Sequence, residues 1–143
     1  DVPPGAAAAI ARDRAAGYRL LMATAAPEFY AAAIADALGF DAIVASRHQR
    51  DADGNWLPVL DGPNCYGEEK ARRVAEWLAA NAPGGTVPIR AYSDHVSDAP
   101  TFALATEAWL IGRGNKFARL AERHGWQTAD FEDAAAGAGA GIR

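Results

Sequence analysis

The sequence predicts an α/β fold in which a mostly parallel sheet lies between two layers of helices, a three-layer, Rossmann-like core with a small β-hairpin. Short apolar runs alternate along the chain with longer segments of helical periodicity. Half of the 143 residues are hydrophobic, which is enough to bury the core of one domain. The pair Asp53-Gly54, between two short extended segments, predicts the hairpin.

The strands are predicted from apolar runs that are bounded by turn residues. They cover residues 18–24, 40–46, 87–93 and 108–111. The hairpin is expected to turn at residues 51–55 and to return along residues 56–60. Pro58 restricts this return arm to the edge of a sheet, because proline has no N–H to donate.

The helices are predicted from a periodicity of three to four residues. They cover residues 3–16, 27–37, 67–81, 99–107 and 116–123. In the second of these, Phe29, Tyr30, Ile34 and Leu38 are predicted to form the buried stripe. We expect residues 1–131 to form the core and residues 132–143, which are rich in alanine and glycine, to be disordered.

Composition narrows the classes of function. The net charge of −4 argues against a nucleic-acid-binding surface. The single cysteine, Cys65, excludes an internal disulfide and fits a reducing compartment, so we expect a cytoplasmic protein. No apolar run approaches the roughly 20 residues of a membrane span, and no signal peptide is visible. Because the chain begins with Asp1 rather than Met, we expect it to be processed or to be part of a longer product.

Polar residues fall where predicted strands end and helices begin. Thr24 ends the first strand, Lys70 opens the helix at residues 67–81, and Asp94 and Asp98 follow the strand at residues 87–93. The carboxyl ends of parallel strands share one edge of a sheet, where ligands bind. Two carboxylates this close repel each other unless a cation such as Mg²⁺ lies between them. We therefore expect Thr24, Lys70 and Asp94 to converge within about 10 Å on one phosphate-binding pocket.

Each of these residues also has a purely structural interpretation. Asp98 can be a helix N-cap and Asp94 a loop carboxylate, and the stretch that contains them favours neither interpretation. Taken singly, Thr24 is more typical of an ordinary β-branched strand residue, and Lys70 of a solvated lysine in a first helical turn. The order and context of the four residues together favour the functional interpretation.

Three segments in order resemble the haloacid dehalogenase superfamily of hydrolases, in particular its phosphoserine-phosphatase-like branch. Residues 17–25 resemble the second motif of that family, residues 64–70 the third motif with its lysine, and residues 92–98 the fourth, an Asp-x-x-x-Asp. The similarity extends from about residue 3 to residue 131. It implies a magnesium-dependent phosphohydrolase that acts on a small phosphorylated substrate through an aspartyl-phosphate.

The resemblance also implies roles for residues at matching positions. Thr24, with Ala25, and Lys70 would bind the phosphate, and Lys70 would also steady the aspartyl-phosphate. Asp94 would ligate Mg²⁺. Asp98 would belong to the metal site, where it would orient a metal-bound water or Lys70.

The first motif of the family, Asp-x-Asp-x-Thr, and the helical cap that follows it are absent from this sequence. Asp51 and Asp53 have the right spacing, but they lie in the predicted hairpin turn. The nucleophile and the general acid are therefore not among these residues. In the family fold the first-motif strand lies between the strand that ends at Thr24 and the one that leads to Asp94. We expect an upstream segment or a partner chain to supply it.

Two classes of function remain open. The first is an enzyme, a magnesium-dependent phosphomonoesterase whose isolated chain is inactive. The alternative is a non-catalytic domain that binds phosphate or a partner. A receiver domain fits poorly, because it needs its acidic pair early and its lysine late, the reverse of the order here. Arg47, His48 and Arg50 form a small basic patch that could face an anionic substrate, although a solvated loop is the simpler interpretation.

Overall fold

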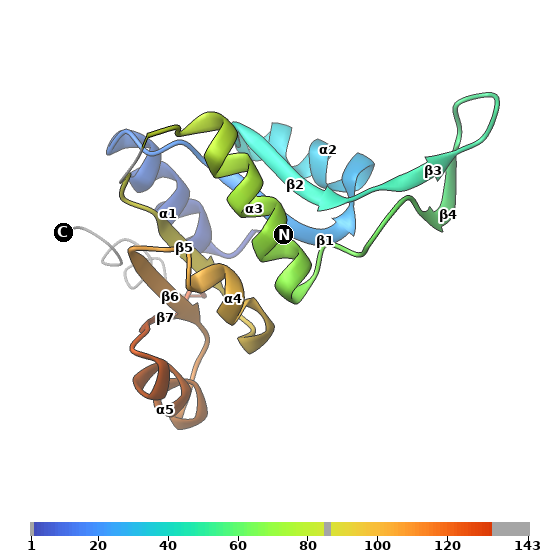
Figure 1. Ribbon diagram of the computed structural model, residues 1–143. Helices are drawn as coiled ribbons and strands as arrows, with labels where there is room; N and C mark the ends of the chain where they lie inside the picture. Colours follow the sequence, from blue (N-terminus) through green and yellow to red (C-terminus); the bar gives the residue numbers. More distant parts are fainter. Residues whose placement is uncertain (1, 85–86, 133–143) are drawn as a thin grey trace. The chain divides into compact units, whose positions relative to one another are not determined.

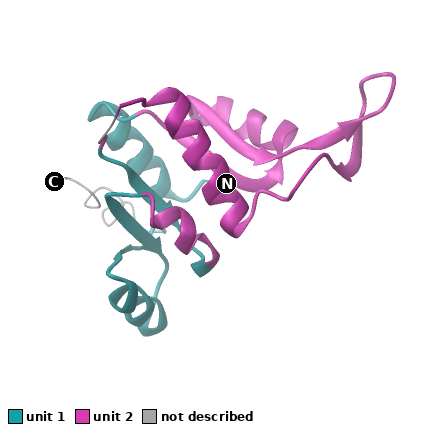
Figure 2. Cartoon of the chain, viewed as in Figure 1, with its two compact units in different colours: residues 1–18, 88–96, 105–143 teal, residues 19–87, 97–104 magenta. Residues whose placement is uncertain are grey.

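The computed structural model describes residues 2–84 and 87–132. It is a mixed α/β structure with mostly parallel strand pairs, as the sequence predicts. The chain divides into two compact units, shown in separate colours in Figure 2. Unit 1 contains residues 1–18, 88–96 and 105–143, and unit 2 contains residues 19–87 and 97–104. Except for Glu132, the predicted disordered tail lies outside the described residues.

Unit 1 is built on a parallel sheet of three strands in the order β5-β6-β7. The strands are β5 (Arg90–Ser93), β6 (Glu107–Ile111) and β7 (Gln127–Ala129), and the helices are α1 (Pro4–Ala15) and α5 (Asn115–His124). The central strand contributes Leu110, which is fully buried, and Trp109, which is 7% exposed. Burial of such side chains is the main stabilising term for this small sheet.

A charged network ties α1 to the sheet of unit 1. The carboxylate of Asp13, which is only 4% exposed, accepts hydrogen bonds from Arg90 at 2.6 Å and from the Tyr92 hydroxyl at 2.7 Å. Arg12 donates a third bond to it at 3.2 Å, and Arg90 also binds Glu107 on the neighbouring strand at 3.0 Å. Burial, reinforced by the bond to Asp13, raises the pKa of Tyr92. The network therefore fixes α1 against β5, the strand that leads to Asp94.

Unit 2 contains the parallel pair β1 (Leu21–Pro27) and β2 (Ala42–Ser46), with helices α2 (Glu28–Leu38), α3 (Gly67–Asn81) and α4 (Ala99–Phe102). A short 3-10 helix, Val96–Asp98, leads into α4. The predicted hairpin is confirmed as the antiparallel pair β3 (His48–Arg50) and β4 (Trp56–Leu60), which projects beyond α2 in Figure 1. The core consists of Val44, Cys65 and Val74, on which neighbouring apolar side chains pack.

Several boundaries differ from the predicted ones. The strand predicted at residues 87–93 begins only at Arg90, because Pro88 has no N–H for the ladder. The helix predicted at residues 99–107 ends at Phe102. Thr106 instead lies just before β6, where its hydroxyl donates to the carbonyl of Ile89 and accepts from the N–H of the same residue, both at 2.8 Å.

The predicted buried stripe of α2 is wrong at three of its four positions, and the fourth, Leu38, is half-buried. Phe29, Tyr30 and Ile34 are 42%, 59% and 36% exposed, whereas the buried residues of this helix are Ala31 and Ala35. Alanine is small enough to let the helix backbone approach the β1–β2 pair closely, so the alanine face packs inward. The larger apolar side chains consequently form an exposed surface.

The parallel strands form two separate sheets within the described part of the chain. There, β1 pairs with β2 on one side, and β5 pairs with β6 on one side. Parallel sheets normally have both faces covered by helices. The strands at their edges present N–H and C=O groups that need hydrogen-bond partners. The insertion of a further strand remains a prediction.

Candidate functional site

The carboxyl end of β1 carries Thr24 and Ala25 in a β-bulge. The register pairs Ala23 with Val44 and Pro27 with Ser46, so four steps along β1 match two along β2. Within the bulge the Thr24 hydroxyl accepts a hydrogen bond from the N–H of Ala26 at 3.0 Å. A hydroxyl that accepts this bond can still donate its own proton. The bulge therefore re-aims Thr24 and Ala25 away from the regular ladder, as bulges near active sites commonly do.

Ser46 joins the end of β2 to the loop that leads into α3. Its hydroxyl donates to the side-chain oxygen of Asn64 at 2.7 Å and accepts from the N–H of Cys65 at 2.9 Å. Both Ser46 and Cys65 are fully buried. Burial raises the pKa of the Cys65 thiol, so this cysteine packs as a small apolar group rather than acting as a nucleophile. The start of α3, and with it Lys70, is thus anchored at the carboxyl edge of the β1–β2 pair.

Replacing Ser46 with alanine is expected to lower the free energy of unfolding by about 1–3 kcal/mol, because the buried N–H of Cys65 would lose its acceptor. Urea denaturation followed by circular dichroism would measure the change. The exposed Thr128 gives a control that also removes one hydroxyl, Thr128→Ala, which should change stability by less than about 0.5 kcal/mol. Equal effects of the two substitutions would show that Ser46 does not anchor the loop.

Lys70 and Asp98 form a buried ion pair within unit 2. The Lys70 ammonium lies 2.7 Å from a carboxylate oxygen of Asp98, and the two side chains are 11% and 15% exposed. Lys70 is therefore not the solvated lysine of the alternative interpretation. Asp98 occupies the N-cap position of α4 but makes no side-chain capping bond there. Its carboxylate instead holds the ammonium of Lys70.

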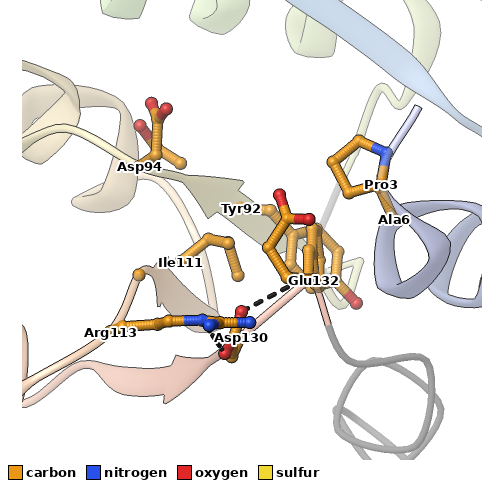
Figure 3. A pocket seen from close by; sticks show the side chains of 11 residues that line it. Pro3, Ala6, Tyr92, Asp94, Ile111, Arg113, Asp130 and Glu132 are labelled. Atoms are coloured by element: carbon orange, nitrogen blue, oxygen red, sulfur yellow. Dashed lines mark hydrogen bonds and ion pairs between the residues drawn. The ribbon is translucent and has the colours of Figure 1, made fainter. Parts of the chain in front are cut away.

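Asp94 belongs to unit 1, whereas Thr24 and Lys70 belong to unit 2, so their convergence within about 10 Å remains a prediction. Asp94 is exposed, directly after β5. It borders a hollow of about 450 Å³ at the carboxyl ends of β5 and β6. Figure 3 shows this hollow, where Arg113 and Asp130 form an ion pair. Across residues 2–84 and 87–132, no group of three or more His, Cys, Asp or Glu side chains is arranged to hold a metal ion.

Asp51 has the role of a turn residue, as predicted. Its carboxylate accepts hydrogen bonds from the backbone N–H groups of Asp53 and Asn55, each at 2.9 Å. The bond from the Asn55 backbone is the main cause that lowers the pKa of Asp51. The carboxylate is thus committed to the hairpin turn and is no substitute for a strand-tip nucleophile.

Comparisons with known proteins identify the family of this chain. A family model for haloacid dehalogenase-like hydrolases matches residues 1–103. The chain belongs to this family. Protein CicA from two strains of Caulobacter vibrioides is 35% identical over 103 residues, which cover 71% of this chain and 44% of CicA. The chain therefore spans less than half the length of the curated relatives that it matches.

Solved structures confirm the predicted fold. A Bordetella pertussis protein of unknown function is 28% identical, with a TM-score of 0.78 over 89% of this chain and 57% of its own. A HAD family hydrolase from Salmonella enterica has a TM-score of 0.66 at 15% identity, covering 85% of this chain and 40% of its own. A probable phosphoserine phosphatase from Vibrio cholerae has a TM-score of 0.65 at 16% identity, covering 85% and 36%. At these low identities the last two show the fold alone.

Among the described residues, no helix combines the length and the apolar character that crossing a membrane requires.

Proposed function

We propose that this chain is the core of a magnesium-dependent phosphomonoesterase that acts through an aspartyl-phosphate, with the nucleophile outside these 143 residues. The main support is the buried Lys70–Asp98 pair, anchored at the sheet edge that also carries Thr24, in a member of a hydrolase family. One bond to Asp98 leaves the ammonium of Lys70 with further N–H donors for phosphate oxygens. Holding such donors in place before the reaction is an effective way to stabilise developing charge.

Each residue of unit 2 has a distinct part in this proposal. The Thr24 hydroxyl and the Ala25 backbone N–H donate to phosphate oxygens. Lys70 neutralises the charge of the phosphate and steadies the aspartyl-phosphate. Asp98 positions Lys70 and would orient a metal-bound water in the complete site.

Magnesium is the cofactor that the family resemblance implies, with Asp94 as a ligand. Mg²⁺ requires near-octahedral oxygen ligation, usually by one or two carboxylates together with waters and substrate phosphate. Asp98 is engaged by Lys70, which leaves Asp94 as the carboxylate that this chain would supply to the metal. A further carboxylate would come from the segment that supplies the nucleophile. When bound, the metal would neutralise charge on the phosphate oxygens.

The substrate in this proposal is a small phosphorylated molecule in a cytoplasmic compartment, and a strand from an upstream segment or a partner chain completes the sheet. A second candidate is a non-catalytic domain that binds phosphate or a partner. Such a domain would keep the fold with Thr24 and Lys70 but would have no nucleophile. The two candidates differ in whether a longer protein that includes the first-motif strand hydrolyses phosphomonoesters.

The 143-residue chain is expected not to hydrolyse p-nitrophenyl phosphate in the presence of Mg²⁺, because the covalent route has no nucleophile. A longer protein that adds a strand ending in Asp-x-Asp-x-Thr should hydrolyse it, and Asp94→Asn should abolish that turnover. Release of p-nitrophenolate would be followed by absorbance. Magnesium-dependent turnover by the short chain, lost in Asp94→Asn, would contradict the expectation. Inactivity of the longer protein would favour the non-catalytic alternative.

A further inference from the structure

One face of α2 and the hairpin that meets the first turn of this helix both carry exposed apolar side chains, and together we call them the α2–hairpin surface. Its helix part contains Tyr30 and Ile34, which are 59% and 36% exposed. The exposed Ala33 lies between them in the sequence, and the exposed Ala37 follows one turn later. Its hairpin part consists of Trp56 and Leu60, which lie on the same side of β4 and are 36% and 39% exposed. Large contiguous apolar surfaces on soluble domains usually mark interaction sites.

Aromatic packing holds the two parts of this surface together. The rings of Phe29 and Trp56 stack with centroids 5.0 Å apart at an interplanar angle of 28°, and Phe29 also meets His48 edge-on at 6.0 Å. The guanidinium of Arg50 lies 3.8 Å from the centroid of Trp56. The surface is therefore preorganised, and binding a partner would not require ordering the hairpin first.

The shape of the helix part suits another helix. Tyr30, Ala33, Ile34 and Ala37 are spaced three and four residues apart, so they lie in one stripe along α2. Small side chains between larger ones create the grooves into which the ridges of a second helix pack. The hairpin projects beyond α2 (Figure 1) and meets this helix at Phe29, in its first turn.

The charges around the surface select among possible partners. Unit 2 has ten Asp and Glu residues against six Lys and Arg residues. Arg47 pairs with Glu28 at 3.8 Å, and Arg50 is stacked on Trp56. Asp36 on α2, and Asp53 and Asp61 on the hairpin, are exposed and form no ion pair within the described chain. Counted with Glu28 and Asp51, these carboxylates outnumber the exposed guanidinium groups of Arg47 and Arg50, so the rim of the apolar surface is net acidic.

An acidic rim disfavours two occupants. A second copy packed face to face would bring the two rims together, and like charges across an interface cost several kcal/mol, a penalty expected to make self-association weak. An anionic membrane surface would be repelled in the same way. We propose that the α2–hairpin surface is a docking site for an amphipathic helix of a protein partner, whose apolar face is flanked by Lys and Arg.

Two designed 20-residue helical peptides would test this docking site. Both have the same Leu and Ile stripe, flanked by Lys and Arg in the basic peptide and by Glu in the acidic peptide. Fluorescence anisotropy of each labelled peptide, titrated with the full chain, gives its affinity. The basic peptide is expected to bind at least about tenfold more tightly than the acidic one, and raising NaCl from about 0.05 M to 0.5 M should weaken its binding several-fold.

Variants separate specific docking from general attraction to an acidic protein. Tyr30→Ser with Ile34→Ser should weaken binding of the basic peptide by about tenfold, because both apolar anchors are lost. Val2→Ser is the matched control, since Val2 is 43% exposed outside this surface, and it should leave the affinity unchanged. Equal binding of both peptides, or equal effects of the surface and control variants, would overturn the proposal. So would a dimer seen by light scattering, or binding to anionic phospholipid vesicles, that the Tyr30→Ser, Ile34→Ser variant abolishes.

Discussion

Replacing Asp13 with alanine is expected to lower the free energy of unfolding by about 3–5 kcal/mol. The carboxylate of Asp13 is 4% exposed and accepts hydrogen bonds from Arg90, Tyr92 and Arg12. The Arg90 side chain is itself only 5% exposed, so losing Asp13 would leave a buried guanidinium with Glu107 as its remaining carboxylate. Breaking a buried charge network by removing one partner costs more than the network contributes as a whole.

The change would be measured by urea denaturation of the full chain, followed by circular dichroism at constant protein concentration. Asp36→Ala is a matched control, because Asp36 is an exposed aspartate on a helix, and it should change stability by less than about 0.5 kcal/mol. Asp13→Asn keeps the size of the side chain and one acceptor oxygen, so its effect should lie between those of the other two variants. If Asp13→Ala is no more destabilising than Asp36→Ala, the network does not hold α1 against the sheet.

The Asp13 network could not be predicted from the sequence. Asp13 lies in a helix whose only large apolar residue is Ile10, so nothing local distinguishes it from a solvated aspartate. Its partners Arg90 and Tyr92 are 77 and 79 positions away in the sequence. Contacts at that separation depend on how the elements pack, and neither periodicity nor capping rules report on packing.

The Lys70–Asp98 pair is easier to predict from the sequence than the Asp13 network. Both residues lie in motifs whose order and spacing resemble one family, and their placement at the starts of helices follows from the alternation of strands and helices. The anchoring role of Ser46 was missed. The one sequence signal for this role is that Ser46 is a polar residue at the end of an apolar strand. Nothing in the sequence indicates that Asn64 and Cys65 are its partners.

The error on α2 has a physical cause that applies widely. Periodicity locates the large apolar residues of a helix on one face, but it does not show which face the rest of the chain covers. In α2 the sheet is covered by Ala31 and Ala35, because small side chains allow the closest approach. The exposed Phe29, Tyr30 and Ile34 then satisfy the same periodicity as a buried stripe would, and so they point to an interaction surface.

Replacing Lys70 with methionine is expected to have two separable effects. The free energy of unfolding should fall by about 3 kcal/mol, because Asp98, whose side chain is 15% exposed, would keep its charge without the ammonium. The affinity for inorganic phosphate, measured by isothermal titration calorimetry, should fall at least about tenfold, since hydrogen bonds to charged groups contribute about 1.5–3 kcal/mol. Lys116→Met, which removes an exposed lysine on α5, is the matched control for the loss of one positive charge.

A double variant separates the structural role of the pair from its role in binding. Adding Asp98→Asn to Lys70→Met removes the stranded carboxylate, so most of the lost stability should return, because a neutral replacement of a buried ion pair is often tolerated. Phosphate affinity should not return, since the ammonium is still absent. If the double variant binds phosphate as tightly as the parent chain, the pair is structural only. If the parent chain binds no phosphate while Lys70→Met is destabilised as expected, the proposed phosphate site is wrong although the ion pair is real.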